Sequence, residues 1–271
     1  MTQSLHPRDG GAIDTIDTDR YNLDDLEFSE WCRAQLEING ALVLPGFFTE
    51  QMIYEVLADS VPRIDEAFFT TNATHNVYLT PPDDQLADDH VFNRQVISTK
   101  GCLAHDQVPS ASPLRTVYES DRFRRFMAHV LDIESVHSYA DNVSGINVHF
   151  HLDEQELGWH FDNSAFAVTA LMQAPESGGV FEYVPNLRDA DANDLNFDGV
   201  EAVLDETVPD RIRTLEFDPG ALVMFRGRNS MHRVTPSRGS IPRVLVVFAY
   251  NTEPGIGLSE SAKLTFYGRN E

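Results

Sequence analysis

The chain has 271 residues, of which 42% are hydrophobic and 10% aromatic, enough to bury a sizeable core in one large domain. It carries 43 acidic against 20 basic side chains, a formal net charge of −23 at pH 7. Such a surface repels phosphate backbones and anionic membranes, so we expect neither nucleic acid nor a membrane as a partner. We expect a small molecule instead.

The two cysteines, Cys32 and Cys102, have no CxxC spacing, which predicts buried, reduced thiols rather than a disulfide framework or a thiolate metal site. The N-terminal stretch Met1–Tyr21 is polar and lacks the apolar run of a signal peptide. The longest apolar runs, Ala41–Phe48 and Val244–Tyr250, have the length of strands and are too short to span a bilayer. These features predict a cytoplasmic protein.

The first half of the chain reads as a flexible tail followed by helices. We expect residues 1–22 to form the tail and residues 23–135 to form a helical layer. A helix over Phe28–Leu36 should end at Asn39-Gly40 and lead into a short strand, Ala41–Leu44. Thr49 is a candidate N-cap for the next helix.

The second half changes to short β-rich runs separated by turns, which predicts antiparallel strands in a sandwich or barrel over residues 136–271. One acidic interruption, at about residues 186–212, is expected to be a lid or surface insert. We therefore predict a single domain over residues 23–271, mainly β with a helical N-terminal layer (α+β). The expected strands are Gly145–Phe150, Ala165–Gln173, Gly179–Val184, Arg213–Phe217, Ala221–Phe225 and Arg243–Tyr250.

A candidate metal site stands in this second half. His160 and Asp162 are two residues apart, so on a strand both side chains project from the same face. His232 lies 70 residues after Asp162, behind a predicted β-hairpin. Two histidines and one carboxylate form the facial triad that suits non-haem iron(II) and leaves coordination positions open for a cosubstrate and O2.

Arg243 makes this interpretation more specific. It follows His232 by 11 residues and begins an apolar strand. An arginine on a strand at the end of a barrel can form a bidentate pair with the distal carboxylate of 2-oxoglutarate. An HxD motif alone is a weak signal, but this order of His, Asp, His and Arg is far more specific.

Several segments resemble bacterial iron(II)/2-oxoglutarate enzymes related to the free-amino-acid halogenases and hydroxylases. The resemblance runs from about residue 100 to the C-terminus. It implies a double-stranded β-helix (jelly-roll, cupin-like) core, iron bound by His160, Asp162 and His232, and 2-oxoglutarate bound by Arg243. The segments that carry it are Leu157–Thr169, Gln173–Pro185, His105–Pro109, Ser112–Arg115 and Leu264–Arg269.

Asp162 separates two chemistries within the resembled family. Its halogenases have glycine at this position, which frees an iron site for chloride. The carboxylate present here implies hydroxylation instead, with desaturation or cyclisation as alternatives that begin with the same hydrogen abstraction. The lysine-acting relatives have polar residues where this chain has Leu157 and Asn163, which argues against a lysine-like substrate.

Further residues near the predicted core are candidates for ligand contacts. His149 and His151 share a strand face, and the expected roles are substrate-side or structural, with a second metal pair less favoured. Asn147 lies on the same face and is a candidate for 2-oxoglutarate, substrate or structural hydrogen bonding. Arg94 and Arg115, in the helical layer, are candidates for a substrate-carboxylate clamp, with surface ion pairs as the alternative.

The sequence thus predicts an iron(II)-dependent oxygenase that couples conversion of 2-oxoglutarate and O2 to succinate and CO2 with hydroxylation of a small polar metabolite, such as a free amino acid. Asn163 is a further candidate for substrate contact. Two other classes stay open. One is a cupin-like protein that binds a ligand without turnover, and the other is a hydrolase or isomerase with zinc at the same triad.

Overall fold

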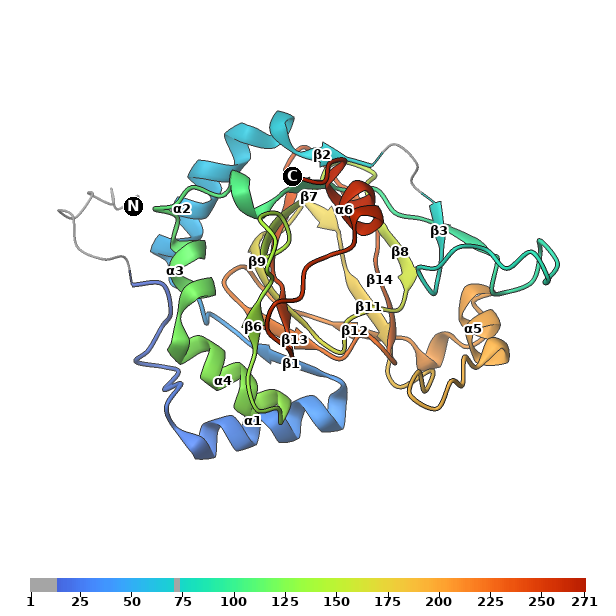
Figure 1. The fold of residues 1–271 in the computed structure, drawn as a ribbon, viewed down its shortest axis with the longest axis horizontal. Helices are drawn as coiled ribbons and strands as arrows, with labels where there is room; N and C mark the ends of the chain where they lie inside the picture. The colour runs from blue at the N-terminus through green and yellow to red at the C-terminus, as the bar shows by residue number, and fades with distance from the viewer. Residues whose placement is uncertain (1–13, 71–73) are drawn as a thin grey trace.

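Two antiparallel sheets and a layer of helices make up the fold (Figure 1). The computed structural model describes residues 14–70 and 74–271. The larger sheet has seven strands in the order β1-β13-β9-β16-β7-β5-β2, and the smaller has four in the order β12-β11-β14-β8. The strands of these two sheets are β1 (Ala41–Leu44), β2 (Phe68–Phe69), β5 (Gly101–Leu103), β7 (Ile146–His151), β8 (Leu157–His160), β9 (Ala167–Gln173), β11 (Phe181–Val184), β12 (Arg213–Leu215), β13 (Leu222–Phe225), β14 (Met231–Val234) and β16 (Arg243–Phe248).

Three two-stranded pairs and six α-helices complete the described part of the chain. The paired strands are β3 (Thr74–Asn76) with β4 (Gln95–Ile97), β6 (His137–Ser138) with β17 (Tyr250–Asn251), and β10 (Ser177–Gly178) with β15 (Ser237–Arg238). The helices are α1 (Leu26–Asn39), α2 (Glu50–Ser60), α3 (Pro113–Glu119), α4 (Asp121–Leu131), α5 (Phe197–Leu204) and α6 (Glu260–Tyr267). Short 3-10 turns cover Val61–Glu66, His105–Gln107 and Pro209–Arg211.

Local sequence signals explain where the first helices begin and end. Asp25 caps α1 by accepting from the backbone N–H groups of Glu27 and Phe28, and Gly40 ends the helix with a left-handed φ of 71°. The predicted cap at Thr49 is also present, since its side chain accepts from the backbone N–H of Met52. The strand expected at Ala41–Leu44 is β1, and it joins the larger sheet beside β13.

The two faces of the larger sheet have different surroundings. Along β16, Val244, Val246 and Phe248 are fully buried, and they pack in the main hydrophobic cluster with residues of the helical layer. Leu245 and Val247, which point the other way, are only partly buried. On β9 the same alternation holds over residues 167–170, whereas Leu171 and Met172 are both buried. The face turned away from the helices is therefore the more accessible one, and it is the face that can line a ligand site.

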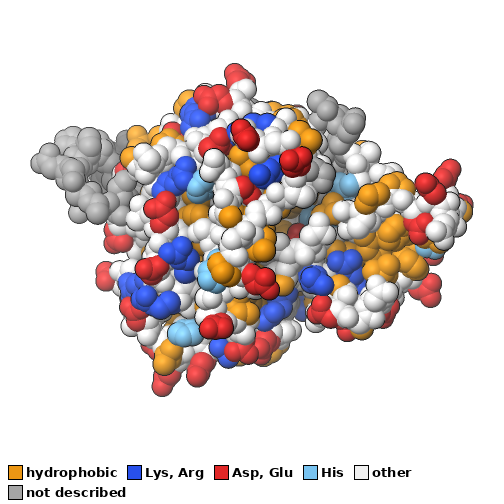
Figure 2. Space-filling model, in the orientation of Figure 1, with side chains coloured by type: hydrophobic (Ala, Val, Ile, Leu, Met, Phe, Trp, Pro, Cys, Tyr) orange, Lys and Arg blue, Asp and Glu red, His pale blue; other side chains and the backbone are white. Residues whose placement is uncertain are grey.

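The six strands expected from the sequence are present in the second half, with ends within two residues of those predicted. The helical layer is less purely helical than predicted, because β2 and β5, besides the expected β1, extend the larger sheet from it. Acidic side chains are scattered over the face seen in Figure 2. No helix among the described residues is long and apolar enough to cross a membrane.

The predicted flexible tail, residues 1–22, includes residues that pack on the body of the protein. Residues 1–13 of that tail lie outside the described residues. From residue 14 the chain packs on the body of the protein: Ile16 forms a β-bridge with Phe48, and the buried Tyr21 donates its hydroxyl to the carbonyl of Pro45 at 2.7 Å. The prediction is wrong for residues 14–22 because these two apolar side chains fill positions in the main cluster.

The acidic insert contains the short helix α5 and packs on the smaller sheet. Val200 and Val203 are fully buried in a second hydrophobic cluster, which includes Trp159 and Phe161 from the segment of β8. The hydroxyl of Tyr78 donates to the carbonyl of Leu195 at 3.1 Å. The insert is thus attached through apolar contacts to the smaller sheet and through a hydrogen bond to the turn after β3.

Candidate metal centre

Neighbouring strands of the smaller sheet bring the predicted ligands together. His160 ends β8 and stands directly opposite His232 on the antiparallel strand β14. Nε2 of His160 and Nε2 of His232 lie 3.7 and 3.6 Å from Oδ1 of Asp162. One ligand atom from each of the three residues can be chosen so that all lie within 4.8 Å of one another. Among the described residues this is the one histidine, cysteine and carboxylate cluster with such geometry.

Hydrogen bonds to backbone carbonyls orient both imidazoles. Nδ1 of His160 lies 2.8 Å from the carbonyl of Gly158, and Nδ1 of His232 lies 3.0 Å from the carbonyl of Ser230. A carbonyl only accepts, so each Nδ1 carries the proton and each Nε2 has a free lone pair directed at the cluster. Phe181 stacks on the ring of His232 with centroids 5.5 Å apart, which restricts its rotation.

Burial keeps the two imidazoles neutral, the form that binds a metal. It lowers the pKa of His160 to about 3 and that of His232 to about 4. Burial also raises the pKa of Asp162, and Oδ2 of that residue is buried without a hydrogen-bond partner. A carboxylate that presents Oδ1 to two free imidazole nitrogens, and whose Oδ2 has no hydrogen-bond partner, fits a divalent cation.

Gly227 supports the carboxylate from the loop before β14. Its carbonyl accepts from the backbone N–H of Asp162 at 3.1 Å. A Cβ at position 227 would stand 1.8 Å from Oδ2 of Asp162, far closer than real Cβ atoms approach. Glycine is therefore required at this position for the carboxylate to occupy its place.

Arg243 lies at the start of β16, opposite His151 on β7. Its side chain is buried, with 3% exposure, and burial lowers its pKa to about 10. No carboxylate among the described residues pairs with this guanidinium. His151 is 2% exposed, and neither of its ring nitrogens has a hydrogen-bond partner. A buried cation with no protein carboxylate as partner, opposite an unpaired imidazole, could receive an anionic ligand.

Lys100 lies beside the predicted residue His149, and no sequence pattern pointed to it. Its ammonium lies 3.3 and 3.2 Å from Nδ1 and Nε2 of His149, whose pKa burial lowers well below its usual value. The predicted substrate-side residue His149 therefore faces a cation. The available signal was weak: Lys100 is one of two lysines in the chain and stands just before a short strand.

The remaining candidates on or near the core take different positions. Asn147 is buried, and its amide donates to the carbonyl of Ser144 at 2.9 Å, so this side chain has a structural partner. Asn163 directly follows Asp162 and is exposed. Asn163 is thus positioned at the surface beside the triad, while Asn147 lies within the larger sheet.

The two arginines proposed as a substrate clamp have partners elsewhere. Arg94 pairs with Asp205 at 2.6 Å, next to the end of α5. Arg115 donates to the backbone carbonyls of His105 and Val108 at 2.7 and 3.0 Å, and it also contacts the ring of His105. Their geometry supports attachment of the insert and bracing of the helical layer rather than the predicted substrate clamp.

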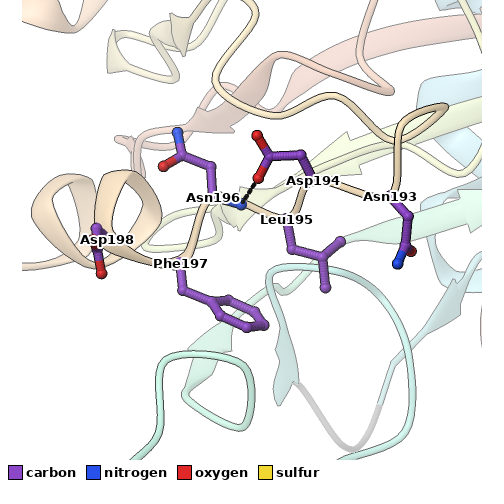
Figure 3. A pocket seen from close by; sticks show the side chains of 6 residues that line it. All are labelled: Asn193, Asp194, Leu195, Asn196, Phe197 and Asp198. Carbon is purple, nitrogen blue, oxygen red and sulfur yellow. Dashed lines mark hydrogen bonds between the residues drawn. The ribbon is translucent and has the colours of Figure 1, made fainter.

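The insert has a surface hollow of its own, separate from the triad (Figure 3). It is lined by residues 193–198, and there the backbone N–H of Asn196 donates to Asp194 at 3.0 Å. The aspartates of this segment form no metal cluster with the geometry found at the triad. The hollow therefore belongs to the turn that precedes α5.

Comparison with known proteins agrees with this geometry. The family model for halogenase D matches residues 94–263. No curated protein sequence matches the chain. An oxidoreductase of the 2OG-Fe(II) oxygenase family from Burkholderia pseudomallei superposes with a TM-score of 0.53 at 15% identity, covering 94% of this chain and 99% of that chain.

A second similar structure is the non-heme α-ketoglutarate-dependent epimerase SnoN from nogalamycin biosynthesis. It has a TM-score of 0.56 at 15% identity, with 87% of this chain and 93% of that chain covered. These likenesses confirm the predicted jelly-roll core with its helical N-terminal part. Together with the family model, they also confirm the predicted relation to iron(II)/2-oxoglutarate oxygenases.

Proposed function

The chain belongs to the halogenase D family, and from this premise we propose that it is an iron(II)- and 2-oxoglutarate-dependent oxygenase that hydroxylates an aliphatic C–H bond of a small polar metabolite, such as a free amino acid. The observation that carries the proposal is the pairing of two sites. One is the triad of His160, Asp162 and His232, and the other is the buried Arg243, which has no protein carboxylate as partner among the described residues. Lys100 lies between them in electrostatic terms, because its charge acts both on Asp162 and on His151, the residue opposite Arg243. The first fits iron, and the second fits the distal carboxylate of a keto acid.

The residues of the chain would hold and orient the reactants. His160, Asp162 and His232 would bind the iron on one face, and Arg243 would bind the distal carboxylate of 2-oxoglutarate. When bound, iron with 2-oxoglutarate and O2 supplies the oxidising power for C–H hydroxylation. The apolar residues Phe181 and Phe225 pack against His232 and would exclude water from that side of the metal.

Asp162 favours hydroxylation within this family. Its carboxylate would occupy the coordination position that the resembled halogenases leave open for chloride. Oδ2 is buried and unpaired, and the Gly227 backbone fixes the residue in place. Desaturation or cyclisation would use the same ligands, so the product mass distinguishes the three outcomes.

The test uses protein reconstituted with iron(II) without oxygen. Addition of 2-oxoglutarate should produce the visible charge-transfer band of an iron–keto-acid complex, and His160→Ala should abolish it. With oxygen, succinate should form faster in the presence of a substrate from an amino-acid panel, and the product should gain one oxygen atom. A cupin-like binding protein would form no succinate, and a zinc enzyme would show no band. Either result would overturn the proposal.

A further inference from the structure

The hairpin of β3 and β4 lies beside β8 (Figure 1) and contacts the backbone on both sides of His160. Ser98 directly follows β4 and forms a β-bridge with the first residue of β8. The Ser98 hydroxyl accepts from the backbone N–H of Gly158 at 2.9 Å. Just after β3, the carbonyl of Val77 accepts from the backbone N–H of Phe161 at 2.8 Å. The hairpin therefore fixes the chain two residues before this metal ligand and one residue after it.

Gly158 is the point at which this support reaches the ligand. Its carbonyl accepts from Nδ1 of His160 at 2.8 Å and so sets the plane of the imidazole. The position requires glycine, because a Cβ there would overlap the carbonyl oxygen of Ile97. Glycine has the least restricted backbone dihedrals of any residue, so contacts from outside the strand have to hold this peptide in place.

Ser98 is itself oriented by His75. Nε2 of His75 lies 2.6 Å from the Ser98 hydroxyl, and its Nδ1 lies 2.8 Å from the carbonyl of Asn76. Burial lowers the pKa of His75, which favours a neutral ring. Because the carbonyl only accepts, Nδ1 carries the one proton and Nε2 accepts from the hydroxyl. The Ser98 proton is then directed at His75, which leaves its lone pairs for the N–H of Gly158.

The ring of His75 also packs directly against the ligand. It meets the ring of His160 edge to face, with centroids 6.1 Å apart and an interplanar angle of 83°. The ring of His232 packs instead against Phe181 and Phe225. Different parts of the chain therefore orient the two histidines. His75 also precedes residues 94–263, so the match to the halogenase D family does not cover it.

We propose that His75 and Ser98 are positioning residues that fix the imidazole of His160 for the metal through the backbone of Gly158. This inference rests on the proposed function, because it concerns the support of one of the proposed iron ligands. The hydrogen bonds form a chain from His75 to Ser98, then to Gly158 and to His160. Loss of the Ser98 hydroxyl would leave the buried N–H of Gly158 unpaired and allow the His160 ring to turn.

The test uses the full-length protein with cobalt(II) in place of iron. In such protein the Nδ1–H proton of each metal-bound histidine gives a strongly shifted NMR signal that exchanges with water. His160→Gln at saturating cobalt(II) identifies the His160 signal by its loss. Ser98→Ala and His75→Phe should each move the His160 signal and speed its exchange with water, while the His232 signal stays in place. Both should weaken cobalt(II) binding by roughly 10-fold, the low end of the effect of losing a ligand's support.

Further variants separate positioning from general stability. Thr99→Val is the matched control, since the Thr99 hydroxyl also accepts from a backbone N–H, that of Glu156 at 3.2 Å. It should lower the free energy of unfolding and leave both NMR signals unchanged. His75→Gln offers an oxygen to the same hydroxyl and should restore most of the binding that His75→Phe loses. The double variant of Ser98→Ala with His75→Phe should bind no more weakly than either single variant, because one chain of hydrogen bonds is broken in each.

Separate outcomes overturn the inference and the proposed function. If the wild type binds no cobalt(II), or binds it without either histidine signal, the proposed metal centre is refuted. If both signals are present and Ser98→Ala and His75→Phe change neither, or change both equally, the positioning inference alone is wrong. It is also wrong if Thr99→Val acts like Ser98→Ala. His75→Phe keeps a ring of similar size and carries the test if Ser98→Ala does not fold.

Discussion

Substitution of Gly227 by alanine should release the metal without removing any ligand. The new Cβ would stand 1.8 Å from Oδ2 of Asp162, whereas real Cβ atoms essentially never approach closer than 3.0 Å, so the two atoms must separate by about 1.2 Å. Metal sites tolerate deviations of only about 0.2 Å in ligand distance. We therefore expect iron binding to weaken by about 10- to 100-fold, as when the support of a ligand is lost.

The assay is an anaerobic titration with iron(II), with cobalt(II) as a stable spectroscopic probe of the same site. The decisive control is the background variant Asp162→Gly, which removes the carboxylate that Gly227→Ala would displace. In that background the alanine should have no further effect on metal binding, so the two substitutions should be strongly non-additive. Wild-type affinity in Gly227→Ala, or an equal loss in both backgrounds, would refute the reasoning.

Three further predictions concern the cosubstrate, the pH dependence and the insert. Arg243→Met should abolish the 2-oxoglutarate absorption band at concentrations that saturate the wild type, while iron(II) titration shows unchanged metal affinity. Metal-free protein should lose stability to urea as the pH falls below about 6.5. Burial lowers the pKa of His160 to about 3 and that of His232 to about 4 in the folded protein. The unfolded chain therefore binds protons at a higher pH than the folded protein does, and acid favours unfolding. His232→Phe should reduce this loss. Arg94→Ala should lower the free energy of unfolding by less than about 1 kcal/mol, since its ion pair with Asp205 is exposed, and leave iron binding unchanged.

The clustering of the three candidate metal ligands could be predicted because their geometry is local or follows from strand pairing. His160 and Asp162 are two positions apart, and the alternation of a strand puts them on one side. His232 required only the further expectation that its strand belongs to the same core. The structure places it directly opposite His160. Arg243 could be selected as the candidate for 2-oxoglutarate because it opens an apolar strand, and the structure shows that its side chain is buried.

Lys100 could not be predicted in the same way. It belongs to no motif, and its position depends on β5 joining the larger sheet from the N-terminal half of the chain. Arg115 was selected by residue type, and no sequence pattern shows that its donors are already used by the carbonyls of His105 and Val108. The docking of residues 14–22 was missed because isolated apolar residues such as Ile16 give no periodic signal.

The division of the interior into separate hydrophobic clusters has a consequence for how the metal could leave. Trp159, Phe161 and Met231, the direct neighbours of the three ligands, pack in the smaller cluster, while Arg243 begins a strand anchored in the larger one. The smaller cluster can open locally at a free energy below that of global unfolding. Backbone amides of β8 and β14 should then exchange with deuterium before those of β7 and β16 in the metal-free protein. Bound iron would slow the exchange of the β8 and β14 amides selectively. Release of the metal and local opening of the smaller sheet would then be thermodynamically coupled.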